Sequence, residues 1–166
     1  SWSHLWFLFY LLLFTVLVWV GSAFNLQRIG DRIMALPPTA LVLLLPLPLA
    51  LSLAGTTVPW PAPEFLLPSL WALVFFGLYF ALGYQLFRRP ATIDHMNALA
   101  PVLLLGALVA YAALFVTTEG FIAARAASPL QHVLHALLEA AAGLWMTLWC
   151  LLAGKRWLDK KRATMR

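Results

Sequence analysis

Charged residues are scarce in this chain of 166 residues. Asp, Glu, Lys and Arg together make up 10% of it, whereas apolar residues make up 63%. Soluble domains carry about 25% charged and about 45–50% apolar residues. A soluble globule of this length has too little interior to hide so much apolar surface. The composition therefore excludes an ordinary soluble domain and a disordered chain, and it predicts an integral membrane protein.

Cysteine is almost absent as well. Cys150 is the single cysteine, so no intrachain disulfide can form. The first apolar run has no charged segment before it and therefore lacks the pattern of a signal peptide. Because the chain begins at Ser1 rather than at Met, we expect an upstream part of the protein to precede it.

Five apolar runs approach or exceed the length needed to cross about 30 Å of hydrocarbon. Because backbone groups in lipid need internal hydrogen-bond partners, each run is predicted to be an α-helix. The predicted fold is thus all-α, a single polytopic transmembrane helix bundle. The second run contains Pro46 and Pro48, and it is either a kinked crossing or a broken, re-entrant segment. The predicted spans are 5–24, 39–55, 66–87, 98–116 and 130–153, followed by a basic tail or linker at 154–166.

Basic residues are distributed unevenly between the two sides that five crossings define. The first connection, the third connection and the tail share one side and hold ten Lys or Arg residues, whereas the other side holds only Arg125. The positive-inside rule makes the ten-residue side cytoplasmic and the N-terminus of the chain extracytoplasmic. The tail lies next to the membrane and contains no recognition module. It therefore favours contact with the lipid bilayer over nucleic acid.

Two short motifs resemble one family. His4-Leu5-Trp6-Phe7-Leu8, followed by an aromatic residue and leucines, resembles the HLWFL helix of the acyltransferase 3 group of membrane O-acyltransferases, and is most similar to its glucan-modifying branch. Residues 79–90, which include Gly83-Tyr84 and Leu86-Phe87-Arg88, resemble the helix through which that family exits onto the cytoplasm. The resemblance implies a bundle of about ten helices in the cell (inner) membrane. This chain would supply about five of them and lack the first and the last.

The resemblance also implies a reaction, the transfer of an acyl group, most simply acetyl, from cytoplasmic acyl-CoA to a hydroxyl of an extracytoplasmic glycan. Acyl-CoA is then a co-substrate, and no bound cofactor is expected. The family's catalytic signature, an Arg with a His eleven positions later, is absent from this sequence. The catalytic His is therefore expected on a missing helix, and the fragment alone is expected to be inactive. The implied partners are the glycan acceptor, acyl-CoA and the missing helices of the same protein.

The first span carries candidate substrate-binding residues at its outer end. His4 stands at the mouth of an otherwise apolar helix, and Trp6 and Tyr10 recur at a spacing that places them on one helix face. A His there can hydrogen-bond a substrate or move a proton near neutral pH, and the aromatic rings can stack on a sugar. The alternative is an interfacial His beside a Trp belt, with Tyr10 serving only to pack helices.

The last span carries the deepest ionisable groups. His132, His135 and Glu139 are three and four residues apart and share one face of the helix, with Glu139 about 14 Å past Leu130. A carboxylate at that depth is expected to face protein or a water-filled cavity, either as part of a functional site or as a hydrogen-bonded link between helices. A metal site is not expected, because no second helix offers His or Cys at matching depth.

This polar face also supports an alternative function from a different class. Intramembrane ionisable groups serve as proton relays in pumps and carriers. The chain would then be a non-catalytic polytopic protein, half of a transporter or a proton-coupled carrier that uses Glu139 and His135.

Four arginines on the predicted cytoplasmic side are candidate ligands for the phosphates of the acyl donor. A guanidinium group meets phosphate oxygens in a bidentate way, which suits acyl-CoA. Their simpler role is to fix the orientation of the helices in the membrane. These residues are Arg28, Arg32, Arg88 and Arg89.

Overall fold

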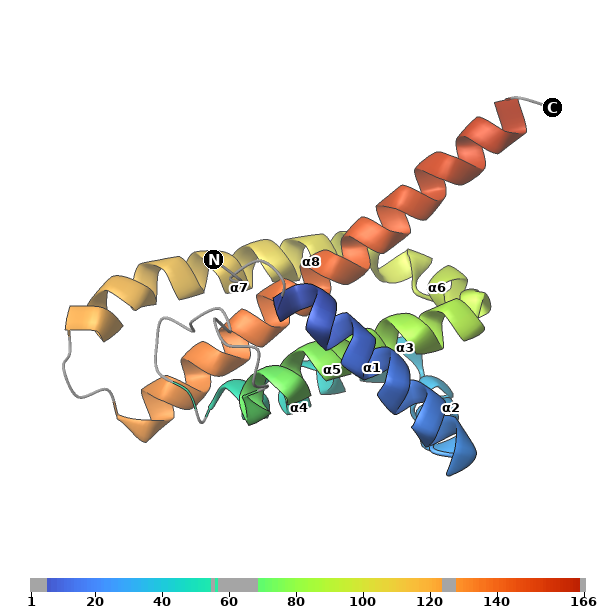
Figure 1. Cartoon of the computed structure of the whole chain (residues 1–166). Coiled ribbons are helices and arrows are strands. Elements are labelled where there is room, and N and C mark those ends of the chain that lie inside the picture. Colours follow the sequence, from blue (N-terminus) through green and yellow to red (C-terminus); the bar gives the residue numbers. More distant parts are fainter. Residues whose placement is uncertain (1–5, 55, 57–68, 124–127, 165–166) are drawn as a thin grey trace.

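The computed structural model describes residues 6–54, 56, 69–123 and 128–164, with side chains except at 6, 119–123 and 159–164. Every regular element in these ranges is helical, which confirms the predicted all-α fold class. The elements are α1 (Trp6–Ala23), α2 (Gln27–Met34), α3 (Pro38–Leu44), α4 (Pro46–Leu53), α5 (Leu70–Arg88), α6 (Pro90–His95), the short 3₁₀ turn η2 (Asn97–Leu99), α7 (Ala100–Ala123) and α8 (Pro129–Thr164) (Figure 1).

Several of these helices are long and apolar enough to cross a membrane. Three ranges meet that condition, Leu70–Arg88, Pro90–Thr118 and Pro129–Leu158, and α1 together with α2 forms a fourth candidate that is bent by 95°. The predicted second span is present as the shorter apolar helix Pro38–Leu53. Its 16 residues extend only about 24 Å, less than the thickness of the hydrocarbon layer.

The first predicted connection contains an amphipathic helix, α2. At the end of α1, Asn25 adopts a left-handed backbone conformation with φ of 56°, which Asn tolerates better than most residues. The Leu26 N–H bonds back to the Gly21 carbonyl at 3.0 Å, as in a Schellman cap. The chain therefore turns sharply at Asn25, and α2 leaves the direction of α1.

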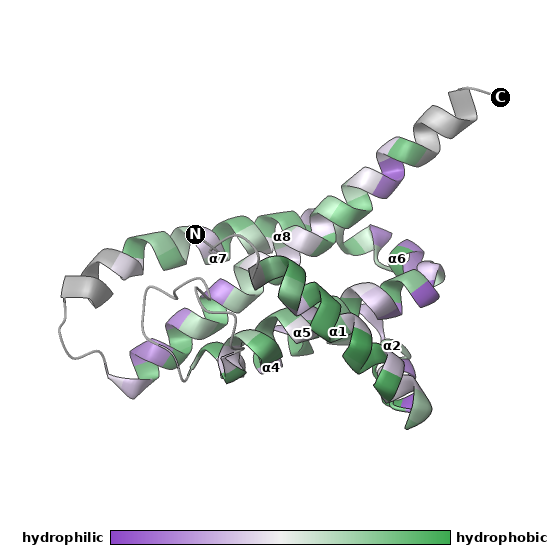
Figure 2. Ribbon diagram, viewed as in Figure 1, coloured by the Kyte–Doolittle hydropathy of each residue, from purple (hydrophilic) through white to green (hydrophobic). Residues whose placement is uncertain are grey.

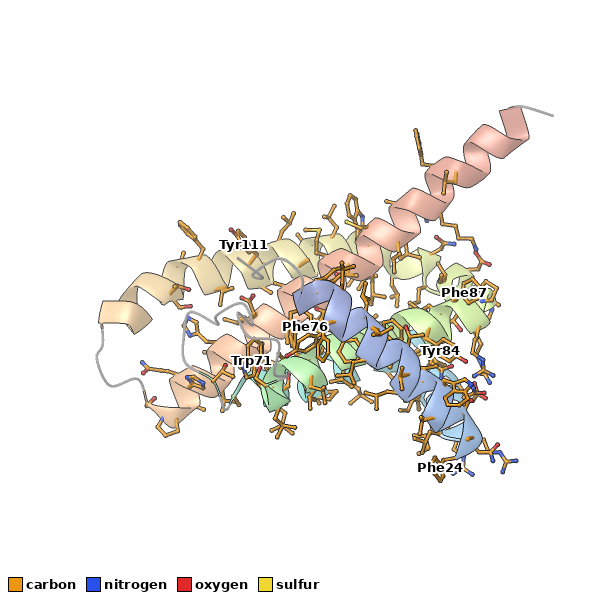
Figure 3. All side chains as sticks on the ribbon, viewed as in Figure 1. Phe24, Trp71, Phe76, Tyr84, Phe87 and Tyr111 are labelled. Atoms are coloured by element: carbon orange, nitrogen blue, oxygen red, sulfur yellow. The ribbon has the colours of Figure 1, made fainter. Side chains whose placement is uncertain are left out.

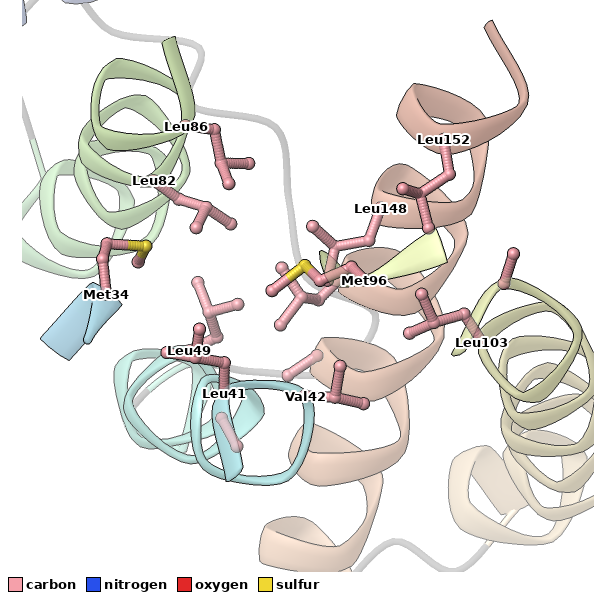
Figure 4. Packing of buried hydrophobic residues seen from close by; sticks show 14 of the residues in the cluster. Met34, Leu41, Val42, Leu49, Leu82, Leu86, Met96, Leu103, Leu148 and Leu152 are labelled. Carbon is pink, nitrogen blue, oxygen red and sulfur yellow. The ribbon is translucent and has the colours of Figure 1, made fainter. Parts of the chain in front are cut away.

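The main core lies where α8 meets the other elements (Figure 4). α8 packs most extensively against α7 and α4, and α4 also packs against α5. Leu144 and Leu152 on α8 are almost fully buried, as is Leu103 on α7. Helix α8 thus forms the central element of the bundle, and it continues as a helix through the predicted basic tail to Thr164.

The proline that begins α4 does not leave the backbone unpaired at Val42. Pro46 has no N–H, so the Val42 carbonyl four residues earlier loses its usual helical donor. The indole Nε1 of Trp145, on α8, donates to this carbonyl at 2.9 Å. A neighbouring helix therefore takes up the freed carbonyl, which is how helices in lipid tolerate proline.

Three segments predicted to share one side of the membrane lie at the same end of the molecule (Figure 1). Asp31 on α2 pairs with Arg88 and Arg89 at the end of α5. Asp94 on α6 pairs with Lys155 on α8. These ion pairs join the first connection, the third connection and the tail into one polar end.

The outer surface of the helices is strongly apolar (Figure 2). Trp19, Phe24, Phe87 and Tyr111 are all more than half exposed, and the last three extend away from the bundle in Figure 3. Apolar side chains around the whole circumference of a helix are typical of helices in a membrane. The apolar surface and the length of these helices therefore suit a protein of the membrane.

Candidate functional site

The polar end of the bundle is organised around Asp31. Its carboxylate accepts a hydrogen bond from Arg88 at 3.4 Å and forms an ion pair with Arg89 at 3.1 Å. The Arg88 guanidinium also lies over the ring of Tyr84, 5.8 Å from its centroid. Gln27, at the start of α2, donates from Nε2 to the Tyr84 hydroxyl at 3.2 Å. These contacts hold α2 against the end of α5.

The structure brings the four predicted arginines to this one end, in two different states. Arg88 and Arg89 are held by Asp31, whereas Arg28 and Arg32 are exposed on α2 and pair with no acidic residue among those described. Four arginines stand against one aspartate, so the cluster keeps a positive charge. An anion that reaches this end therefore meets two accessible guanidinium groups and two that are already oriented.

A groove of about 450 Å³ runs between α1, α2 and α5 next to this cluster. Most of its wall is apolar, and Gln27, Tyr84 and Gln85 form its polar end. The side chain of Gln85 is only 8% exposed, and its oxygen Oε1 is buried with no hydrogen-bond partner in the described part of the chain. This amide lies so close to α2 that a Cβ at Gly30 would stand 1.9 Å from its nitrogen.

Sequence reasoning did not single out Gln85. The available signal was a lone amide within an apolar helix, one turn before the two arginines at its end. Burying a polar side chain in such a run costs free energy unless the side chain finds a hydrogen-bond partner. The position of Gln85 alone could therefore have marked it as a candidate residue.

The outer candidates on α1 are described only in part. His4 lies outside the described residues, and Trp6 begins α1 without a described side chain. Tyr10 is 1% exposed, and its hydroxyl accepts a hydrogen bond from the Ser69 N–H at 3.2 Å. Its ring packs edge-to-face on Phe76, with 6.3 Å between the ring centroids. Tyr10 therefore lies inside the α1–α5 contact, where it also lines a cavity of about 250 Å³.

The polar face of α8 points toward other helices. His135 is buried, and its Nε2 is hydrogen-bonded to the Thr117 hydroxyl of α7 at 3.3 Å. Glu139 is half-buried one turn later and lies within electrostatic range of His135 and of Tyr79 on α5. The Tyr79 hydroxyl lies against α8, 3.0 Å from where a Cβ at Gly143 would stand. Polar side chains of α7, α8 and α5 therefore lie near one another, and the bond between His135 and Thr117 joins two of these helices.

The polar face of α8 and the arginine cluster are separate. α8 begins at the end of the bundle opposite to α2 and α6 (Figure 1), and His135 and Glu139 lie in its first three turns. Within the described residues, no three His, Cys, Asp or Glu side chains converge as metal ligands would.

Comparison with known proteins adds no assignment. The chain matches no family model, no curated protein and no solved structure.

Proposed function

We propose that the chain is part of an integral-membrane O-acyltransferase of the cell (inner) membrane. It would transfer an acyl group, most simply acetyl, from cytoplasmic acyl-CoA to a hydroxyl of an extracytoplasmic glycan. The observation that carries the proposal is the contact between the two motif helices. Tyr10 and Phe14 of α1 pack against Phe76 and Phe80 of α5, over Ala72. The two helices that carry segments resembling one family thus pack against each other.

The proposal includes five crossings within a bundle of about ten helices. The α3–α4 segment is the second crossing, with the polar end of α2, α6 and α8 in the cytoplasm. Ten of the eleven basic residues then lie inside, whereas an α3–α4 segment that did not cross would place the arginines of α2 and α5 on opposite sides. The ion pairs between Asp31 and both Arg88 and Arg89 support their location on one side.

The residues of this chain have defined roles in the proposed reaction. Arg28 and Arg32 hold the phosphates of acyl-CoA, together with the pre-oriented Arg88 and Arg89. The polar face of α8 lines the path of the glycan hydroxyl from the other side. Acyl transfer also needs a base for that hydroxyl and hydrogen-bond donors for the oxyanion that forms on the thioester carbonyl. The base would be a His outside this chain.

Acyl transfer from radiolabelled acetyl-CoA to glycan acceptors tests the proposal in membranes that contain the complete gene product. We expect the double variant Arg28→Gln/Arg32→Gln to raise KM for acetyl-CoA about tenfold or more, because two charge-assisted contacts are lost. The control is Arg156→Gln, an arginine at the same end that is held by Asn97. An unchanged KM would remove the assigned role of α2, and no transfer to any of several glycans would contradict the enzyme.

The polar face of α8 supports a second candidate function, a proton-coupled carrier. The hydrogen bond between His135 and Thr117, with Glu139 one turn away, is an arrangement suited to passing protons between helices. Solute flux driven by a pH gradient in proteoliposomes separates the two candidates. A carrier would show such flux and lose it in Glu139→Gln, whereas an acyltransferase would show none.

A further inference from the structure

Thr117 of α7 contacts the imidazole of His135 on α8, with 3.3 Å between the threonine hydroxyl and Nε2. We infer that Thr117 is a positioning residue that keeps His135 as the tautomer protonated at Nε2, so that Nδ1 is the ring atom that takes up and releases a proton. The inference requires neither acyl transfer nor carrier function, because it concerns the protonation of one side chain.

The hydrogen bonds within α7 decide which group donates to which. The Thr117 hydroxyl lies 2.7 Å from the Ala113 carbonyl and 3.2 Å from the Leu114 carbonyl, and a carbonyl oxygen can only accept. A hydroxyl has one hydrogen and two lone pairs, so its hydrogen goes to a backbone carbonyl and only a lone pair is left for His135. The imidazole must therefore donate, and its hydrogen lies on Nε2.

A hydrogen on Nε2 leaves Nδ1 as the basic atom, because a neutral imidazole carries one hydrogen. Nδ1 is bonded to Cγ and so lies closer than Nε2 to the backbone of α8, the helix that also carries Glu139 one turn later. Glu139 is within electrostatic range of His135. A proton that reaches the polar face of α8 therefore binds at Nδ1, where the nearby carboxylate stabilises the resulting imidazolium.

Protonation at Nδ1 leaves the contact between α7 and α8 intact. Nε2 keeps its hydrogen in both the neutral ring and the imidazolium, so the bond to Thr117 has a donor in both states. If Thr117 donated instead, protonation of Nε2 would break the bond. The direction of this one hydrogen bond thus allows His135 to change its charge without releasing the helix pair.

The other titratable groups near His135 are few. On α8 itself, His132 and Glu139 lie about one turn away. Among the described side chains of the helices packed against α8, α4 has no titratable group, α7 has only Tyr111, and α5 brings Tyr79 against α8. Within this set Glu139 is the acidic group that can balance a proton on Nδ1.

Nitrogen NMR of protein isotopically labelled at histidine tests the inference on the complete gene product in bilayers, with the His135 signals identified by their loss in His135→Gln. At mildly alkaline pH we expect a slowly exchanging hydrogen on Nε2 and none on Nδ1. In mild acid Nδ1 should gain a hydrogen while the Nε2 hydrogen exchanges no faster than before. A hydrogen on Nδ1 in the neutral ring, a ring whose protonation is the same in both conditions, or faster exchange at Nε2 in acid would each overturn the inference.

Variants of α7 test the role of Thr117. Thr117→Val removes the hydroxyl at nearly constant size and should speed exchange of the Nε2 hydrogen about three- to tenfold, the factor that one hydrogen bond provides. Thr117→Ser keeps the hydroxyl and should restore slow exchange. Thr118→Val is the matched control, because the Thr118 hydroxyl donates to the Leu114 carbonyl of its own helix at 2.6 Å. Unchanged exchange in Thr117→Val, or equal acceleration in Thr118→Val, would overturn the positioning role.

Discussion

At the scale of single residues, the contact between Trp145 and the Val42 carbonyl shows how this bundle accommodates proline. Pro46 removes one helical donor, and a side chain of α8 replaces it at 2.9 Å. In hydrocarbon no water is present to satisfy the carbonyl instead. One side chain therefore both orients the α3–α4 segment and anchors it to α8.

Replacing Trp145 by Phe should destabilise the protein by about 1–3 kcal/mol, because it leaves the Val42 carbonyl without a donor. In a Pro46→Ala background the cost should be smaller, since an alanine at this position restores the helical N–H. Unfolding in a denaturing detergent, monitored by circular dichroism, measures both values. Trp149→Phe, half-buried on the same helix, is the control. Equal costs for Trp145→Phe in the two backgrounds would show that this hydrogen bond has no special role.

Gly106 determines how closely α7 approaches α8. A Cβ at this position would lie 2.9 Å from the ring of Trp145, which is itself fixed by its hydrogen bond. Gly106→Ala should therefore cost about 1–3 kcal/mol through overpacking. Gly154→Ala, where a Cβ meets open space, should be neutral or stabilising by up to about 1 kcal/mol. Thermal unfolding of the two variants in the same detergent compares them, and a Gly106→Ala protein as stable as Gly154→Ala would contradict this packing argument.

At the scale of elements, α2 lies between the arginine cluster and the groove formed with α1 and α5. It is short and turned by 95° from α1, with polar residues that face the end of α5. Searching for membrane-length apolar runs overlooks such a helix, because its apolar residues alternate with Arg28, Asp31 and Arg32. An eight-residue amphipathic segment is stable mainly through what it packs against, and that partner is not visible in the local sequence.

Removing the charge of Asp31 should loosen α2. In Asp31→Asn the attraction to Arg88 and Arg89 weakens by about 1 kcal/mol or less, as is usual for partly exposed ion pairs. The equilibrium constant for local unfolding of α2 should then rise up to about fivefold. Faster hydrogen exchange of the α2 amides measures this change. Exchange in α7 should not change. Asp94→Asn, which releases Lys155 instead, should leave α2 as it is; faster exchange of α2 in that variant as well would refute a specific role of Asp31.

The long helices were predictable because lipid leaves the backbone few alternatives. Runs of apolar residues near α1, α5, α7 and α8 indicated helices, and the inward orientation of Glu139 followed from the cost of a carboxylate in hydrocarbon. Helix pairing was not predictable, because helices that are apolar on all sides show no single packing face. The α7–α8 contact depends on small residues whose role is visible only in space. These are Gly106, Ala110, Ala141 and Ala142.

At the scale of the whole molecule, the bundle has an apolar outer surface and polar residues gathered toward its ends. The end with α2, α6 and the last turns of α8 carries the ion pairs and most basic residues whose side chains are described. The polar face of α8 begins at the other end (Figure 2). The proposed site for the acyl donor requires this polarity, since it places an anion at the arginine-rich end.

The most direct test of the account is the accessibility of single cysteines to a membrane-impermeant maleimide. Cys150 is the only native cysteine, so Cys150→Ser gives a background without thiols. New cysteines at the exposed positions Arg28, Ala91 and Leu158 probe the arginine-rich end, and one at Ser128 probes the other. We predict that the first three react only in inverted vesicles, whereas the cysteine at position 128 reacts in intact spheroplasts. Labelling of the Arg28 and Ala91 sites from opposite sides would contradict the proposal that α2, α6 and the end of α8 lie together in the cytoplasm.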